Sequence, residues 1–236
     1  MLLHRLTEHC WYTDSDPATD RPSLGYILGN NGRSIVVDAG NSEKHYLDFI
    51  SCIKKEELPL PELCVITHSH WDHVLGISAV KVPVIANSIS QGHLREMCSW
   101  DSSQFEAFWS ENEFVRAEYL SWNLIHPKTA TISFSGKITV DLDGIIVTAE
   151  QVVSPHSDDS LLVYVPSDGM IFAGDSSAGD FSLPNIAYVP ELLDAYTEKV
   201  LGMDFQIFLH SHREPTDRTQ TEIFLREAKE RGYYVF

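Results

Sequence analysis

Six consecutive residues, His68 to His73, constrain this chain more than any other feature. They contain three histidines and one aspartate: His68, His70, Asp72 and His73. Borderline-soft cations such as Zn²⁺ bind imidazole nitrogen and carboxylate oxygen. Four such donors this close together cannot all bind one tetrahedral ion without severe backbone strain, but they can bind two neighbouring ions. The spacing therefore predicts a two-metal centre, in which the ions lie roughly 3.5–4 Å apart.

The residues on either side place this cluster in a loop. Residues 62–67 form a short apolar, β-branched stretch that predicts a buried strand. Residues 74–80 are typical of a short helix. The cluster therefore follows the carboxyl end of a strand, which is where α/β folds usually bind ligands.

Residues 67–76 read Thr-His-Ser-His-Trp-Asp-His-Val-Leu-Gly, and they match the pattern T-H-x-H-x-D-H-x-x-G at every fixed position. Four further residues occur in the order expected along the chain. Asp38 precedes this segment, and His156, Asp175 and His212 come after it. In these features the chain resembles the metallo-β-lactamase superfamily, over roughly residues 24–215. The resemblance implies an α/β fold, the four-layer αββα sandwich of that superfamily.

The resemblance also implies a set of metal ligands. His68, His70 and His156 would bind the first metal, Asp72, His73 and His212 would bind the second, and Asp175 would bridge the two. Asp38 would support the metal loop without binding metal. The last ligand is open to one alternative, because Ser211 and Arg213 stand where the family usually has glycines. His210 competes for the role, and the distance to Pro215 favours His212.

Such a centre is expected to ionise a water shared by its two divalent ions, and the resulting hydroxide would be the nucleophile. We expect Zn²⁺, with Mn²⁺ or Fe²⁺ as alternatives. Asp72 would have a second, catalytic role by accepting a hydrogen bond from the hydroxide. The substrate would be an ester, thioester, lactone or phosphodiester of a small molecule. Arg213 is a candidate to grip a carboxylate or phosphate of that substrate, or else to pair with an acidic residue; Ser176, Ser177, Asp180 and Tyr188 are further candidates for contact.

Two other classes of function stay open at this point. One is a non-haem iron oxidoreductase on the same scaffold, since iron also accepts imidazole and carboxylate ligands. The other is a metal-binding protein without catalytic activity. A β-lactam substrate is less expected, because the first residues lack the apolar stretch of an export signal.

Composition restricts the partners and the location. The net charge is −17, from 17 basic and 34 acidic residues, which argues against nucleic acid and anionic membranes as partners. The four cysteines show no paired spacing, so we expect a reduced, cytoplasmic protein. No segment has the apolar length of a membrane span. The oligomeric state is left open.

The chain is expected to form a single domain over residues 1–236, with a helical, aromatic-rich insertion at about residues 88–122. The insertion is predicted as two helices, and most of its aromatic side chains are expected to pack on the sheet. The alternative is that one or two of them lie over the metals and shape a pocket. Residues 24–28 and 34–38 predict one β-hairpin. Residues 131–134 and 137–141, around Ser135-Gly136, predict a second.

Overall fold

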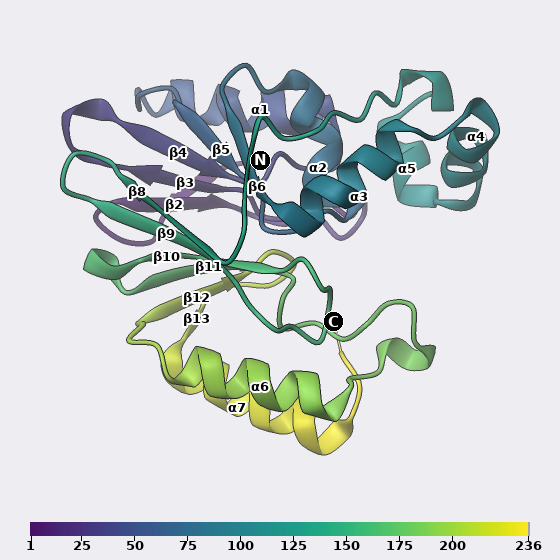
Figure 1. Ribbon diagram of the computed structural model, residues 1–236. Coiled ribbons are helices and arrows are strands. Elements are labelled where there is room, and N and C mark those ends of the chain that lie inside the picture. The colour runs from purple at the N-terminus through teal and green to yellow at the C-terminus, as the bar shows by residue number, and fades with distance from the viewer. Residues whose placement is uncertain (236) are drawn as a thin grey trace.

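Two β-sheets lie face to face in the centre of the protein, as the computed structural model shows (Figure 1). The structure describes residues 1–235. Within them the first sheet holds seven strands in chain order: β1 (Leu3–Arg5), β2 (Cys10–Thr13), β3 (Gly25–Leu28), β4 (Ser34–Val37), β5 (Leu63–Val65), β6 (Val84–Asn87) and β7 (Ile132–Phe134). Pairing is antiparallel from β1 to β4 and parallel from β4 to β7.

The second sheet comes from the later part of the chain. Among the described residues it holds six strands in the order β13, β12, β11, β10, β9, β8. Their bounds are β8 (Lys137–Asp141), β9 (Ile146–Gln151), β10 (Leu161–Val165), β11 (Met170–Gly174), β12 (Ile207–His210) and β13 (Thr216–Asp217). Only the β11–β12 pair is parallel within this part of the structure. Each half of the chain therefore builds one sheet.

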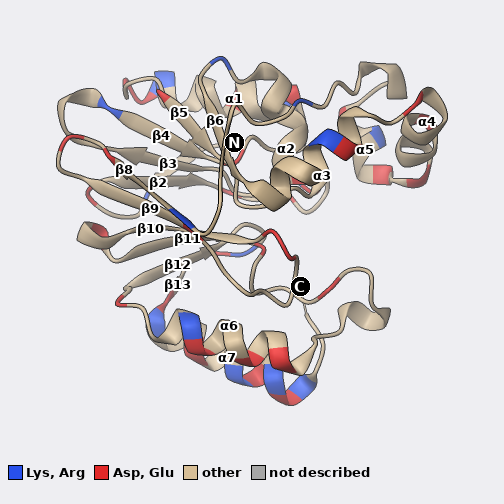
Figure 2. Ribbon diagram, viewed as in Figure 1, with Lys and Arg blue, Asp and Glu red and all other residues tan. Residues whose placement is uncertain are grey.

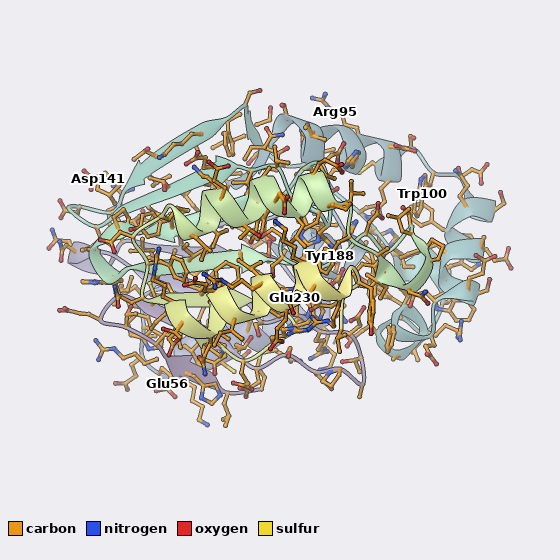
Figure 3. The ribbon with its side chains drawn as sticks, turned by 90° about the horizontal axis from the view of Figure 1, so that it is seen from below. Glu56, Arg95, Trp100, Asp141, Tyr188 and Glu230 are labelled. Atoms are coloured by element: carbon orange, nitrogen blue, oxygen red, sulfur yellow. The ribbon has the colours of Figure 1, made fainter. Side chains whose placement is uncertain are left out.

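Helices cover the outer face of each sheet. Figure 1 shows α1 (Glu43–Lys55) and α3 (Ser88–Cys98) on the first sheet, and α6 (Pro190–Leu201) and α7 (Arg218–Arg231) on the second. Figure 3 shows α6 and α7 side by side across the second sheet, with Asp141 and Trp100 toward opposite ends of the molecule. The predicted four-layer αββα sandwich is confirmed. Among residues 1–235, no helix combines the length and apolarity needed to cross a bilayer.

The central strands carry apolar side chains on both faces, because each face packs against another layer of the fold. In β4, Ile35 and Val37 pack between the two sheets, whereas Val36 packs toward the outer helices. In β11, Phe172 faces the other sheet and Ile171 faces α6 and α7. Strand side chains alternate with a period of two, so a strand covered on both faces needs apolar residues at every position.

Helix α1 begins at a side-chain cap and buries one apolar face. The Ser42 hydroxyl accepts a hydrogen bond from the His45 backbone N–H at 3.1 Å, which caps the first turn. Tyr46, Phe49 and Ile53 then recur at helical spacing, and all three are buried against the first sheet. The helix carries the polypeptide from the end of β4 to the start of β5, so it fixes the spacing of the two loops that reach the site.

The insertion contains more helices than predicted. Residues 88–118 form three α-helices, α3, α4 (Ser102–Glu111) and α5 (Glu113–Glu118), and a 3₁₀ turn follows at Trp122–Leu124. The two-helix prediction was wrong because two internal capping residues were not recognised. Asp101 and Asn112 each accept backbone hydrogen bonds that begin a new helix. Figure 1 shows α4 and α5 projecting beyond the sheets at one end of the molecule.

The first predicted hairpin is confirmed, and the second was wrong. Strands β3 and β4 pair antiparallel across the short 3₁₀ turn at Asn30–Gly32. In contrast, β7 pairs with β6 in the first sheet and β8 pairs with β9 in the second. Ser135 and Gly136 therefore carry the chain from one sheet to the other. A turn dipeptide permits a change of direction, but long-range packing selects the partner strand.

Candidate metal centre

The loop after β5 is held rigidly from two sides. On one side, the Asp38 carboxylate accepts hydrogen bonds from the Thr67 N–H at 2.7 Å and the Thr67 hydroxyl at 2.8 Å. On the other side, the buried Asp159 carboxylate accepts the Ser69 N–H at 2.8 Å. Helix α2 (Trp71–Val74) begins directly after His70. Because the loop backbone is fixed in this way, its imidazole and carboxylate side chains point in defined directions.

Three imidazoles form the first group of donors. Nε2 of His156 lies 3.2 Å from Nε2 of His68 and 2.9 Å from Nδ1 of His70. Nδ1 of His156 lies 3.1 Å from the Gly179 carbonyl, so it donates there and leaves Nε2 to face the other two rings. Burial lowers the pKa of His156 to about 4 and holds the pKa of His68 well below its usual range. Neutral imidazoles with converging nitrogens are the form that binds a cation.

Two carboxylates and two imidazoles form the second group. Nε2 of His212 lies 3.0 Å from Oδ2 of Asp72 and 3.4 Å from Oδ2 of Asp175. Nε2 of His73 lies 3.2 Å and 3.4 Å from the same two oxygens. Burial opposes charge here, but the carboxylates of Asp175 and Asp72 outweigh it and raise the pKa of His212 to about 10. This group therefore stabilises positive charge between its carboxylates.

Asp175 joins the two groups. Its Oδ2 atom lies 3.9 Å from Nε2 of His156 in the first group, besides its contacts in the second. Gly174, just before it, has a φ of +55°, and a Cβ there would lie 2.5 Å from the Thr67 hydroxyl. Glycine at this position therefore allows the end of β11 to approach the histidine loop of the first sheet.

The chemistry of the donors fits two divalent cations. In each group the donor atoms lie within 4.8 Å of one another. Two buried atoms at the centre, Nε2 of His73 and Oδ1 of Asp175, have no hydrogen-bond partner among the described residues. A buried polar atom without a partner costs free energy, and coordination to a cation would remove that cost. Mixed imidazole and carboxylate donors suit Zn²⁺, Mn²⁺ or Fe²⁺.

Asp38 occupies the supporting position expected of it. Besides its two bonds to Thr67, its Oδ2 atom accepts a hydrogen bond from Nδ1 of His73 at 2.8 Å. That contact fixes the ring so that Nε2 faces the second group. Carboxylates that orient a metal-binding histidine in this way also increase the basicity of the ring.

His210 and His212 lie in different environments in the structure. His212 lies in the second group, whereas Nδ1 of His210 accepts the backbone N–H of His212 at 3.1 Å. The His210 ring stacks on Tyr234 with centroids 5.8 Å apart, and its Nε2 atom lies 3.3 Å from the Tyr234 hydroxyl. Burial lowers the pKa of His210 to about 3, so this ring is neutral. The geometry therefore favours His212 as the seventh donor.

A pocket of about 720 Å³ opens above the two groups. Its floor is formed by residues from both groups, namely His70, Asp72, His156, Asp175 and His212. Its walls are largely aromatic, with side chains from Trp71, Phe114, Phe181 and Tyr234. The insertion supplies Phe114 from α5, in agreement with the alternative that one or two of its aromatics would lie over the site.

The other candidates for substrate contact do not line this pocket, namely Ser176, Ser177, Asp180 and Tyr188. The Ser176 hydroxyl donates to the Ala173 carbonyl at 2.7 Å, and the Tyr188 hydroxyl donates to the Ser177 carbonyl at 3.0 Å. Asp180 accepts hydrogen bonds from Ser182 in its own loop. Several pocket residues were not predicted from the sequence, among them Asp20, Phe181 and Tyr234. They come from loops and the chain end, where no sequence motif marks them.

Comparison with known proteins identifies the family. The chain belongs to the metallo-beta-lactamase superfamily, whose family profile matches residues 18–220. Most members of this superfamily are metal-dependent hydrolases. The resemblance drawn from residues 67–76 and the other landmarks is therefore confirmed. No curated protein sequence matches the chain.

Solved structures share the fold at low sequence identity. A metallo-beta-lactamase from Pontibacter korlensis is 17% identical, with a TM-score of 0.62, over 95% of this chain and 98% of that one. The B3 metallo-beta-lactamase BLEG-1 is 17% identical, with a TM-score of 0.66, over 89% of this chain and 95% of that one. The sec-alkylsulfatase Pisa1 from Pseudomonas sp. is 13% identical, with a TM-score of 0.70, over 97% of this chain but only 41% of that longer one.

Proposed function

We propose that this protein is a dinuclear metal-dependent hydrolase of small molecules. The observation that supports it most strongly is the shared carboxylate of Asp175, whose Oδ2 atom lies 3.4 Å from His73 and His212 and 3.9 Å from His156. His68, His70 and His156 would hold one divalent ion, and Asp72, His73 and His212 the other. Zn²⁺ is the first candidate for both sites.

A pair of divalent ions bound by these residues would supply ionised water at neutral pH and would polarise the bond to be cleaved. The side chains would position the reaction. Asp72 lines the pocket floor, so its carboxylate would accept a hydrogen bond from the attacking water. Asp38 would keep the His73 ring in place.

The substrate would be an ester, thioester, lactone or phosphodiester that fits the pocket of about 720 Å³. That volume suits a small molecule. We propose a reducing compartment such as the cytoplasm, since Cys10, Cys52, Cys64 and Cys98 are all free thiols and two of them lie in the core.

Elemental analysis and a substrate panel test this function together. Two divalent ions per chain are expected, with hydrolysis of at least one of a set of chromogenic esters, thioesters, lactones and phosphodiesters. His70→Ala should abolish hydrolysis and reduce the metal content, while circular dichroism shows an unchanged fold. The exposed His126 provides the control, and His126→Ala should retain both properties.

Three results would contradict the proposal. They are protein without stoichiometric metal, full activity in the His70→Ala variant, and iron-loaded protein that consumes oxygen and hydrolyses nothing in the panel. The last would instead support the iron oxidoreductase.

A further inference from the structure

Arg213 was the candidate to grip an anionic substrate, and the structure places it elsewhere. Its guanidinium carbon lies 4.5 Å from the ring centroid of Phe224 and 4.8 Å from that of Tyr234. Its Nε atom donates a hydrogen bond to the Tyr234 hydroxyl at 3.0 Å. Arg213 is not among the residues that line the pocket. Arg213 therefore supports Tyr234, which lines the pocket, and does not itself reach the substrate.

No lysine or second arginine takes its place in the described part of the chain. Among the described residues, neither Lys nor Arg lines the pocket above the two donor groups. Within residues 1–235, Asp20 is the one carboxylate outside those groups that lines the pocket, and its Oδ1 atom lies 3.6 Å from Nδ1 of His212. Figure 2 shows Lys and Arg interleaved with Asp and Glu along α6 and α7, on the outer side of the second sheet.

Most of the remaining wall is apolar, with Ser15 and His210 as its further polar residues. Trp71 and Phe114 come from the side of the first sheet, and Phe181 and Ala178 from the loop after β11. Phe181 packs edge-on against the His156 ring, with centroids 5.4 Å apart and planes at 87°. These surfaces favour an aromatic or branched group through apolar burial and ring contacts.

A carboxylate on the substrate would be poorly accommodated against such walls. It would lose hydration without gaining a charge-assisted hydrogen bond from Lys or Arg, and it would approach the Asp20 carboxylate. Bound metal ions add positive charge only at the floor, where the scissile group must lie. An anion attracted there would compete with the reacting bond.

We infer that the pocket selects substrates that are uncharged near the scissile bond and that carry an aromatic or branched apolar group. This inference rests on the proposed hydrolase function and specifies its substrate class. The reaction would be hydrolysis of an acyl C–O or C–S bond, in which water adds to the acyl carbon and an acid and an alcohol or thiol are released. Among the proposed substrates this disfavours the phosphodiester, which is anionic at the scissile bond. The anionic product would find no lysine or arginine side chain to retain it among the described residues that line the pocket.

Two esters with the same leaving group test the selectivity. We expect kcat/KM to be at least tenfold higher for p-nitrophenyl phenylacetate than for mono-p-nitrophenyl succinate, after correction for their rates of spontaneous hydrolysis. The comparison is repeated at high salt, which screens long-range repulsion by the net charge of −17. A ratio near one, or a preference for the succinate ester, would overturn the inference.

A matched pair of variants tests whether the effect is local. Phe181 and Ile223 are both 51% exposed, but only Phe181 lines the pocket. Phe181→Arg should shift the ratio about tenfold toward the succinate ester, whereas Ile223→Arg should leave it unchanged. The two variants change the net charge equally. Equal shifts in both would assign the selectivity to the overall charge and contradict a role for the pocket walls.

Binding to metal-free protein separates this inference from the proposed function. Trp71 lines the pocket, so we expect its fluorescence to report saturable binding of phenylacetamide, at least tenfold tighter than binding of succinamate. Trp71→Phe provides the background signal of the other tryptophans. Selective binding combined with an inert ester panel would reject the hydrolase and retain the pocket preference. Equal binding of the two probes, or no saturable binding of either, would reject the preference itself.

Discussion

Environment, and not residue type, assigns different roles to His210 and His212. The two histidines are two positions apart, yet one faces carboxylates and the other faces an aromatic ring. The carboxylates of Asp175 and Asp72 raise the pKa of His212 to about 10 against the effect of burial, and burial lowers the pKa of His210 to about 3. Only His212 of this pair is thus placed to share a cation with acidic neighbours.

Substitution of each histidine should separate these roles. His212→Ala should lose about one metal equivalent per chain, because it removes a donor to the second ion. His210→Ala should retain both equivalents, since its ring contacts Tyr234 and the His212 backbone. The measurement is metal content after dialysis against a low concentration of free zinc. A larger loss in the His210 variant would reverse the assignment.

A second residue-level prediction concerns acid stability. His45 is fully buried, and burial lowers its pKa from the ordinary value of 6.5 to about 3, with Arg21 adding to the effect. In the unfolded chain the pKa returns to its ordinary value, so unfolding takes up a proton at lower pH. The stability from this group is therefore fully present above about pH 6.5 and is lost as the pH falls toward 3.

Urea unfolding of metal-free protein at several pH values measures this effect. Between about pH 7.5 and 5.5, the free energy of unfolding of the unsubstituted protein should fall by about 1.4 kcal/mol more than that of His45→Gln. Glutamine cannot take up a proton in this pH range. Parallel stability profiles for the two proteins would show that His45 does not contribute.

The sequence predicts the donors better than it predicts the pocket. His68, His70, Asp72 and His73 lie within one short motif, which predicts a metal site directly. The family resemblance implies the other three, His156, Asp175 and His212, and the structure brings all seven side chains together in two groups. The pocket walls carry no such signal. Phe181 and Tyr234 reach the site only because loops and the chain end fold over it, and the sequence does not encode those contacts locally.

At the scale of elements, a close approach between two loops supports the site. The short 3₁₀ helix at Leu75–Ala79 packs against the turn between β4 and α1. A Cβ at Gly76 would lie 1.9 Å from the Ala39 carbonyl oxygen, and the Gly76 N–H donates to the Gly40 carbonyl at 3.0 Å. Asp38, which orients His73, lies directly before that turn. Glycine at position 76 therefore allows the close approach that keeps Asp38 in place to orient His73.

Two glycine substitutions should have opposite effects on stability. Gly76→Ala should lower the free energy of unfolding by about 3 kcal/mol, because the backbone must move to accommodate the methyl group. Gly92 lies within α3, and an added Cβ would meet no other atom within 4 Å, so Gly92→Ala should raise it by roughly 0.5–1 kcal/mol. Urea denaturation measures both values. Equal effects would mean that the contact at Gly76 is readily relieved.

Elements differ in how far local sequence determines them. Helix α1 could be predicted closely, since Ser42 caps it and its apolar residues recur at helical spacing. The segment at Ser135-Gly136 could not, because its flanking strands join different sheets. The pairing of β7 with β6 depends on the whole insertion that separates them in the chain, which no local pattern describes.

Over the whole molecule, the two donor groups connect the two sheets. The histidine loop follows β5 of the first sheet, whereas His156, Asp175 and His212 follow β9, β11 and β12 of the second. Each group therefore takes donors from both halves of the chain. A metal ion in either group would cross-link the sheets next to their shared apolar core.

Metal binding should consequently raise the thermal stability of the whole fold. An ion that binds only the folded state at about 100 times its dissociation constant adds about 2.7 kcal/mol, or roughly 5–10 °C in Tm for a chain of this size. Differential scanning calorimetry with zinc and then with excess EDTA should show this rise and its reversal. His212→Ala should show a smaller rise, because one group lacks a donor, and His126→Ala should show the full rise. We expect one thermal unfolding transition that shifts to higher temperature as a whole, because the donors join both sheets. An unchanged Tm, or a shift confined to part of the transition, would show that the donor groups do not hold the two halves together.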